Sequence, residues 1–262
     1  MSIHPSAIID SRAEIGPDVT IGPFCIVAGD VRLARGATLD SHVVVYPGTA
    51  IGEGSRVYPN AVLGGDPQSV DFDTRSLTRT TIGAGCLVRE AVTVHRSTSE
   101  DRETTVGDGS MLMANSHIGH DCKLGRQVVV TSYAGISGHC TIDDYAVIGG
   151  FVGIHQKVRV GTMAMVGGWS RVTMDCPPYT ISAGVPCEPH SLNLVALRRR
   201  GVSPEARAAL KSAFRLLYRS DLNMSQAFER VREEVPVCRE VELLLDFLSQ
   251  VNEGAMGRGL GR

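Results

Sequence analysis

The residues best suited to chemistry gather in one short segment, Asn115–Cys122, which reads Asn-Ser-His-Ile-Gly-His-Asp-Cys. In it His120 is followed directly by Asp121, and His117 comes shortly before them. An imidazole can take a proton from a hydroxyl near neutral pH, and an adjacent carboxylate can fix its tautomer and stabilise its charged form. No serine or cysteine is obviously partnered as a nucleophile. The segment therefore predicts acid–base catalysis of a direct transfer, without a covalent intermediate.

The element that must position these residues is a repeat of six. From Ile3 to Leu63, 11 successive positions spaced six apart hold Ile, Val or Leu; three more such positions run from Ile82 to Val94 and 12 from Val106 to Val172. A strict period this short is neither helical nor a simple alternation, and it is the signature of hexapeptide solenoids. The predicted fold is an all-β solenoid, a parallel β-helix whose repeated aliphatic side chains point inward.

Glycines and two interruptions mark the corners of the predicted coil. A glycine often follows the repeated residue, as after Ile15, Ile51 and Val160. We expect these glycines at corners because glycine tolerates unusual backbone angles. Residues 64–81 shift the phase of the repeat, and residues 95–105 interrupt it without a shift. Both segments predict loops ejected from the coil, and loops on a rigid scaffold often carry function.

The repeat also predicts which residues lie side by side. Three hexapeptides close one coil, so residues 18 apart in sequence stack on the same wall, about 4.8 Å apart. Gly138 and Gln156 then lie above His120, and His139 lies above Asp121 in a neighbouring column. In the column of His120, the backbone N–H of Gly138 could face the oxygen of a tetrahedral intermediate.

Other interpretations of the histidines stay open at this point. A lone histidine on a solenoid wall is usually a solvated surface residue, but His117, His120, His139 and His155 gather within three coils. Zinc is the second alternative, because γ-class carbonic anhydrases share this solenoid and bind zinc through three histidines across a subunit boundary. A scaffold that only trimerises is the third, and it would leave the stacked column unexplained.

Composition excludes several classes of protein. A formal net charge of −2 gives no global field to attract nucleic acid, so no nucleic-acid partner is expected. No apolar run reaches the ~18 residues that a membrane span needs, and the first residues lack a signal-peptide pattern, so we expect a cytoplasmic protein with no membrane span. Seven cysteines without a Cys-x-x-Cys predict reduced, structural thiols.

The pattern becomes helical after Pro177-Pro178. We expect a parallel β-helix domain over 1–190 and a helical domain over 191–262. The arginine run at 198–200 is as consistent with a solvated helix end as with a site for a diphosphate or an acidic protein. The helices are expected near 191–200, 203–217, 224–235 and 237–252.

These motifs resemble a known family. Asn115–Cys122 is similar to the N-A-H-I-x-H-D-C motif of the acyl-carrier-protein–UDP-N-acetylglucosamine O-acyltransferases (the LpxA family), which begin lipid A biosynthesis. The resemblance covers essentially the whole chain, helical tail included. It extends to Gly138-His139, Ile148–Gln156, Val166–Gly168, Pro177–Tyr179 and Leu197–Gly201.

The resemblance implies a left-handed β-helix, a homotrimer and active sites in clefts between subunits. It implies transfer of an (R)-3-hydroxyacyl chain from acyl carrier protein to the 3-hydroxyl of a UDP-amino-sugar, UDP-N-acetylglucosamine, with no cofactor and no metal. His120 is then the general base, Asp121 orients and charge-balances it, and the Gly138 N–H forms the oxyanion hole. The basic helices would meet the acidic carrier protein.

The resemblance also assigns substrate-binding residues. Gly168 occupies the place of the acyl-length ruler, where a small residue leaves room for a longer chain. The nucleotide would be met by Asn193, Arg199 and Arg200. The sugar and thioester pocket, together with the first ejected loop, would contribute His117, His139, His155, Gln156 and Gln68.

Two departures from the family pattern leave nucleotide recognition open. The first loop reads Gln68-Ser69-Val70-Asp71 where the family usually has Gln-Asp-Leu-Lys, so an acid and a phosphate-binding lysine are missing. Arg75 and Arg79 are the candidates to replace that lysine. Val195 stands where an acidic residue is usual. The acceptor could therefore be the 3-amino analogue of the sugar, which would give an amide.

Two related acyltransferase classes fit less well. The N-acyltransferase of the next acylation step has a sizeable domain before its repeats, whereas the repeats here start at Ile3. Hexapeptide acetyltransferases that use acetyl-CoA usually lack a three-helix tail.

Overall fold

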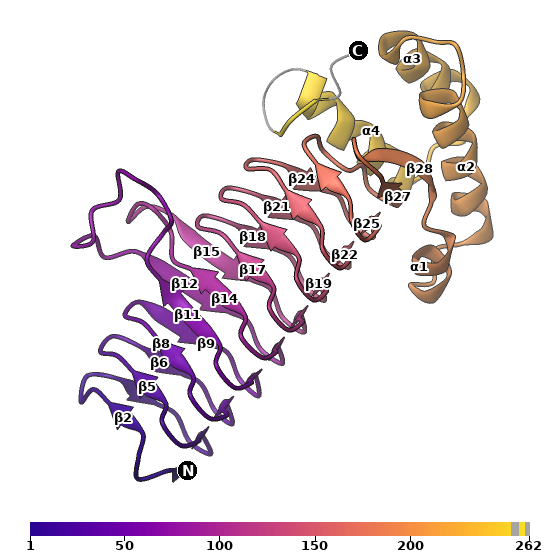
Figure 1. The fold of residues 1–262 in the computed structure, drawn as a ribbon. Helices are drawn as coiled ribbons and strands as arrows, with labels where there is room; N and C mark the ends of the chain where they lie inside the picture. Colours follow the sequence, from indigo (N-terminus) through magenta and orange to yellow (C-terminus); the bar gives the residue numbers. More distant parts are fainter. Residues whose placement is uncertain (253–256, 260–262) are drawn as a thin grey trace.

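The aliphatic residue of each hexapeptide is the inward-facing member of a two-residue strand. Ile118, Ile136 and Ile154 are at most 2% exposed, and the residue before each of them points outward. The computed structural model describes residues 1–252 and 257–259, and it shows these strands wound into a three-sided, left-handed β-helix that ends in helices (Figure 1). The predicted fold class is confirmed.

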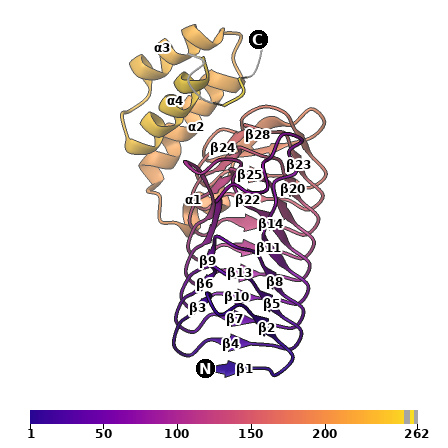
Figure 2. The ribbon, with the colours of Figure 1, turned by 90° about the vertical axis from the view of Figure 1, so that its left-hand side faces the viewer.

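Each side of the solenoid is one sheet of parallel strands, coil stacked on coil from the N-terminus to the helical end (Figure 2). Sheet A consists of β1 (Ser2–Ile3), β4 (Thr20–Ile21), β7 (Thr38–Leu39), β10 (Arg56–Val57), β13 (Leu87–Val88), β16 (Met111–Leu112), β19 (Val129–Val130), β22 (Val147–Ile148), β25 (Met165–Val166), β27 (Thr180–Ala183) and β28 (Glu188–Leu192). Of these, β27 and β28 pair antiparallel and close the C-terminal end of the sheet.

The other two sides carry the remaining strands. Sheet B consists of β2 (Ile8–Ile9), β5 (Ile26–Val27), β8 (Val44–Val45), β11 (Val62–Gly65), β14 (Thr93–His95), β17 (His117–Ile118), β20 (Gly135–Ile136), β23 (Gly153–Ile154) and β26 (Arg171–Val172). Sheet C consists of β3 (Glu14–Ile15), β6 (Arg32–Leu33), β9 (Thr49–Ile51), β12 (Arg79–Ile82), β15 (Glu103–Val106), β18 (Lys123–Leu124), β21 (Thr141–Ile142) and β24 (Arg159–Val160).

The expected reason for the glycines after the aliphatic residues is wrong. Gly16, Gly52 and Gly161 do not have a positive φ. A Cβ at any of them would instead lie 2.4–2.8 Å from an atom of the next coil. These positions need glycine because successive coils approach closely there. The left-handed backbone falls later in each corner, often on a residue with a side chain, such as Asp121 (φ 58°) or His139 (φ 62°).

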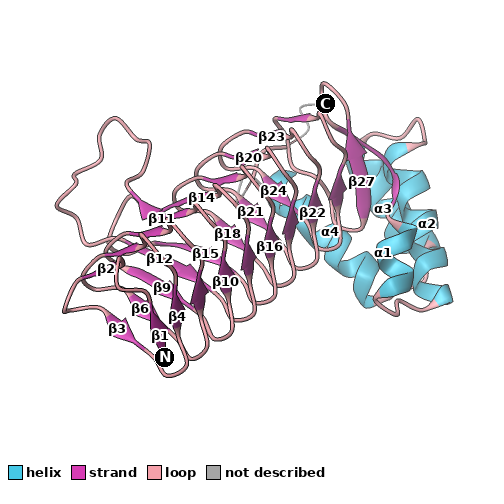
Figure 3. Ribbon diagram, turned by 60° about the horizontal axis from the view of Figure 1, so that its bottom comes forward, coloured by secondary structure: helices cyan, strands magenta, loops and turns pink. Residues whose placement is uncertain are grey.

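Both interruptions of the repeat are loops, as predicted, and both leave the solenoid at the corner where sheet B passes into sheet C, here called the B–C corner. The first connects β11 to β12 and projects away from the coil (Figures 1 and 3). The second connects β14 to β15 on the next coil. The coil after that turns this corner at residues 119–122. The loops therefore emerge directly beside the His120-Asp121 segment.

Among the described residues, four helices follow the solenoid: α1 (Leu194–Arg199), α2 (Pro204–Tyr218), α3 (Met224–Glu234) and α4 (Arg239–Asn252). The side chains of Ser203 and Asn223 cap α2 and α3, and a buried cluster that includes Leu210, Phe214 and Leu244 holds the helices together. In the described part of the chain, no helix has the length and apolar character needed to cross a membrane. All seven cysteines are free thiols.

Candidate active site

A cavity of about 570 Å³ lies on the outer face of sheet B and continues around the B–C corner. It is lined by Gln68, His95, His117, Gly119, His120, Gly135, Ile136, Ser137, Gly138, Gly153, Ile154, His155, Gln156, Arg171, Val172 and Thr173. The cavity thus gathers six of the residues singled out from the sequence: Gln68, His117, His120, Gly138, His155 and Gln156.

His120 and Asp121 form a hydrogen-bonded dyad at this corner. Nδ1 of His120 lies 2.7 Å from Oδ2 of Asp121, whose side chain is 3% exposed. With the proton on Nδ1 donated to the carboxylate, Nε2 of His120 is left as the proton acceptor. The imidazole itself is 16% exposed and lies on the wall of the cavity. This is the geometry of a general base oriented by a carboxylate.

Asp121 is held by the second ejected loop. Oγ1 of Thr98 donates to Oδ2 of Asp121 at 2.8 Å, and the Thr98 N–H lies 3.3 Å from both carboxylate oxygens. Burial raises the pKa of Asp121, but the hydrogen bonds from His120 and Thr98 outweigh it and leave the pKa below its ordinary value. Asp121 is therefore a fixed negative charge that can stabilise an imidazolium.

Gly138 lies against the reactive edge of His120. A Cβ built on Gly138 would be 2.6 Å from Nε2 of His120, so only glycine fits above the ring. The described residues offer no hydrogen-bond acceptor to the Gly138 N–H. A free N–H beside the proton acceptor is what an oxyanion hole requires. Gly119 keeps it accessible, because a Cβ there would lie 2.8 Å from the Gly138 nitrogen.

His117 and His95 form a second histidine pair in the cavity. Their rings meet edge to face with centroids 4.8 Å apart, and Oγ1 of Thr93 lies 2.8 Å from Nδ1 of His117. Burial lowers the pKa of His117 to about 4 and also lowers the pKa of His95. Both imidazoles are therefore neutral near pH 7 and suited to hydrogen-bonding a substrate. Sequence reasoning missed His95 because the inserted loop separates the paired strands β14 and β17 by more than 18 residues, as Val94 opposite Ile118 shows.

The two ejected loops are tied together beneath the cavity. The buried Arg96 guanidinium pairs with Asp66 at 2.8 Å and also donates to the backbone carbonyls of Thr74 and Ser76. One arginine of the second loop thus bonds three residues of the first loop, Asp66, Thr74 and Ser76. Gln68, in the same loop, lines the cavity.

The other predicted site residues lie away from this cavity within one chain. His139 stands behind the dyad, its Nε2 3.7 Å from Asp121. Gly168 lies on the corner between sheets A and B. Asn193 caps α1 and donates to the Met163 carbonyl. The Arg200 guanidinium lies over the Tyr145 ring at 4.0 Å, and Arg199 is its exposed neighbour. In a single chain, therefore, Asn193, Arg199 and Arg200 do not meet the dyad.

The two proposed replacements for the missing lysine do not reach the cavity either. Arg75 pairs with Asp73 at 2.9 Å and its side chain is 88% exposed. Arg79 lines a separate hollow on sheet C. Neither arginine can meet a phosphate beside His120 in this chain.

Comparison with known proteins decides the family. One family model, described as UDP N-acetylglucosamine O-acyltransferase, domain 2, matches residues 175–259, and another, for six bacterial transferase hexapeptide repeats, matches residues 103–138. The acyl-[acyl-carrier-protein]–UDP-N-acetylglucosamine O-acyltransferase of Thermodesulfovibrio yellowstonii is 42% identical over 96% of this chain and 98% of its own. The chain belongs to the UDP-N-acetylglucosamine O-acyltransferase family.

Solved structures place the fold in the same acyltransferase family. The LpxA structure from Bacteroides fragilis has a TM-score of 0.93 at 34% identity, and that from Acinetobacter baumannii a TM-score of 0.92 at 35% identity. Each comparison covers 99% of both chains. The likeness therefore includes the ejected loops and the helical tail as well as the β-helix.

The zinc alternative is not favoured for this O-acyltransferase. His120, Asp121 and His139 do bring three potential ligand atoms within 4.8 Å of one another. However, the 2.7 Å between Nδ1 of His120 and Oδ2 of Asp121 is a hydrogen-bond distance. Two ligands of one tetrahedral zinc stand roughly 3.3 Å apart, given bonds of about 2.0 Å. The geometry supports the acid–base interpretation.

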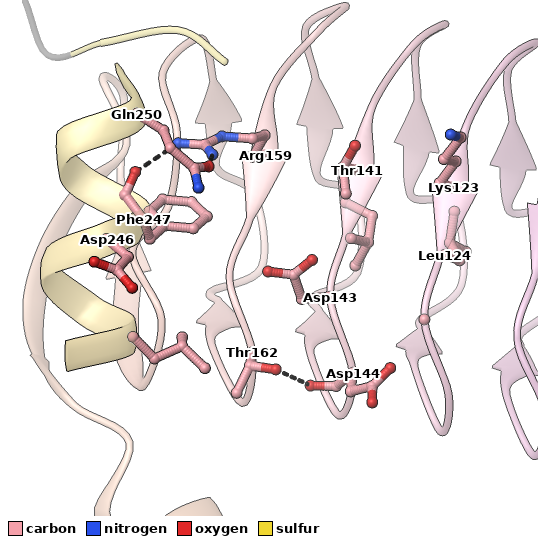
Figure 4. Close-up of a pocket in the computed structure, with 13 residues that line it drawn as sticks. Lys123, Leu124, Thr141, Asp143, Asp144, Arg159, Thr162, Asp246, Phe247 and Gln250 are labelled. Atoms are coloured by element: carbon pink, nitrogen blue, oxygen red, sulfur yellow. Dashed lines mark hydrogen bonds between the residues drawn. The ribbon is translucent and has the colours of Figure 1, made fainter. Parts of the chain in front are cut away.

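A second cavity, of about 530 Å³, lies between sheet C and α4 of the O-acyltransferase (Figure 4). Arg159 crosses it, pairs with Asp175 at 2.8 Å and donates to the Phe247 carbonyl and to Gln250. These bonds anchor α4 to the solenoid. Asp143 faces the same cavity, and burial raises its pKa to about 6. The arrangement couples the two parts of the chain rather than forming a reaction centre.

Proposed function

We propose that the protein transfers an (R)-3-hydroxyacyl chain from acyl carrier protein to the 3-hydroxyl of UDP-N-acetylglucosamine, the first step of lipid A biosynthesis. Family membership over nearly the whole chain supports the reaction. The observation that carries the mechanism is the His120–Asp121 dyad with the free Gly138 N–H above it.

The geometry supports a single displacement on the thioester. Nε2 of His120 takes the proton of the sugar 3-hydroxyl as its oxygen attacks the thioester carbon. The negative charge that develops on the carbonyl oxygen is met by the Gly138 N–H, and Asp121 stabilises the imidazolium. The carbon–sulfur bond then breaks, and the departing thiolate takes the proton from His120. Protons and charge balance with no other reactant.

The position of the remaining residues supports a homotrimer. Asn193, Arg199 and Arg200 lie at another corner of the triangle, so a neighbouring copy would have to supply them to the cavity. We propose that they meet the nucleotide there, that Gly168 limits the acyl chain, and that the helices α1 to α4 receive acyl carrier protein. We also propose that the protein acts in the cytoplasm.

The test is mass spectrometry of products from UDP-N-acetylglucosamine and from its 3-amino analogue, each with carrier protein loaded with different 3-hydroxyacyl chains. We expect an ester of UDP-N-acetylglucosamine from the wild type and no product from His120→Ala, which should keep its fold. His4→Ala, at an exposed position on the first coil where φ is not positive, is the matched control. An amide alone would move the acceptor to the amino analogue, and activity of His120→Ala within a few-fold of wild type would reject the general base.

A further inference from the structure

We propose that Arg171 is the cationic residue that binds a substrate phosphate group in the catalytic cavity, an inference that rests on the proposed function. Arg171 is the outward-facing residue of β26, since its neighbour Val172 is buried in the core. The arginine is exposed and lines the same cavity as His120.

The floor of the cavity leads from the histidines to this arginine. Strand pairing stacks His117, Gly135, Gly153 and Arg171 in one outward column on sheet B. A Cβ on Gly135 or Gly153 would meet no atom within 4 Å, so the backbone does not require glycine at either position. The two glycines leave this part of the cavity wall without side chains. A substrate can therefore lie along the wall between His117 and Arg171.

The charge of the cavity is concentrated at one end of this floor. Of the described residues that line the cavity, Arg171 alone carries a permanent positive charge, and none is a carboxylate. Its guanidinium forms no ion pair within the described residues. The hydrogen bonds that join Arg171 to Gly184 and Cys187 use its backbone. Most other arginines on the solenoid wall, such as Arg32 with Glu14 and Arg126 with Asp144, are paired.

Size identifies the chemistry of the ligand. Arg171 lies three coils beyond His117, about 14 Å along the wall at ~4.8 Å per coil. A reacting group at His120 and an anion at Arg171 must therefore belong to an extended molecule. Both substrates qualify: the nucleotide sugar through its diphosphate, and the acyl donor through the phosphodiester of its pantetheine arm. A planar guanidinium binds either phosphate through paired hydrogen bonds.

Initial-rate kinetics with each substrate varied in turn distinguish the two sources. We expect Arg171→Ala to raise KM for one substrate about tenfold or more at low salt, with kcat changed less than threefold. A rise for UDP-N-acetylglucosamine identifies the diphosphate, and a rise for acyl carrier protein identifies the pantetheine arm. Arg171→Lys should recover part of the loss, and the salt dependence of the affected KM should weaken in Arg171→Ala. Both KM values within twofold of wild type would overturn the inference.

Two controls separate this outcome from others. Arg32→Ala removes an arginine from a distant coil and should leave both KM values unchanged. Calorimetric titration of wild type and Arg171→Ala with UDP-N-acetylglucosamine, and with 4′-phosphopantetheine, measures binding without turnover. If the wild type forms no product but binds one of these ligands, and Arg171→Ala abolishes that binding, the proposed function is rejected and the phosphate site is kept. A wild type that binds neither ligand would reject the site.

Discussion

Replacing Gly138 with alanine should disable catalysis by moving His120, without unfolding the coil. The new Cβ would lie 2.4 Å from Cε1 and 2.6 Å from Nε2 of His120. Ordinary contacts between carbon atoms are about 3.5–4.0 Å, so the imidazole must move by about 1 Å or more. Gly138 does not have a positive φ, so alanine brings no backbone strain.

The expected loss of kcat follows from the hydrogen bond that this movement breaks. His120 is held by one short hydrogen bond, 2.7 Å to Asp121, and a shift of about 1 Å takes it beyond hydrogen-bonding range. A misplacement of about 1 Å in a catalytic group typically costs about 100-fold in rate. We therefore expect kcat of Gly138→Ala to fall about 100-fold, while the melting temperature changes by only a few degrees.

The assay is steady-state acyl transfer together with thermal melting, and the chain offers a matched control. Gly135→Ala adds the same methyl group on the same wall, where a Cβ meets nothing within 4 Å. Because Gly135 belongs to the floor of the cavity, we expect any effect of this methyl group on KM, while kcat should stay within about threefold since the group does not touch His120. If Gly138→Ala keeps kcat within threefold of wild type, the packing of His120 against Gly138 does not position the base. If both variants lose activity equally, the effect is one of cavity volume.

Two further variants test the surroundings of the dyad and of α4. Thr98→Val removes the hydroxyl that donates to Asp121 at 2.8 Å, so kcat should fall about tenfold with KM unchanged. Thr98→Ser should restore kcat. An unchanged kcat in Thr98→Val would show that the loop does not hold the carboxylate. Burial raises the pKa of Asp143 to about 6, above an unfolded value of about 3.9, so the folded state binds more protons between these values and stability falls as pH rises through that window. Asp143→Asn should therefore melt above wild type at pH 8 but not at pH 4, and equal differences at both pH values would contradict the assignment.

The period of six predicted the core and one column of the site because every coil has the same length. It placed Gly138 and Gln156 on the wall above His120, where the cavity now gathers them. It could not place Thr98 or His95, because inserted residues break the arithmetic at the corner from which they come. Their contacts depend on how the loops fold back, and that is determined by pairs such as Arg96 with Asp66.

The glycines show a second limit of sequence reasoning. A glycine after an aliphatic residue is consistent both with unusual backbone angles and with a close neighbour, and the two cannot be separated without coordinates. Gly16 and Gly52 proved to be cases of close approach. Arg171 was invisible for a related reason, since an arginine on a solenoid wall is ordinary until the cavity beside it is known.

At the B–C corner, inserted residues lengthen the chain without changing the register of the coils. Ile51, Ile82 and Val106 pair in register on sheet C although both ejected loops lie between them in the sequence. Extra residues at this corner therefore project outside the β-helix, and the coils on either side stay in register. Loops of different length and chemistry can therefore be inserted at this corner to change what reaches His120, while the β-helix that holds the base keeps its geometry.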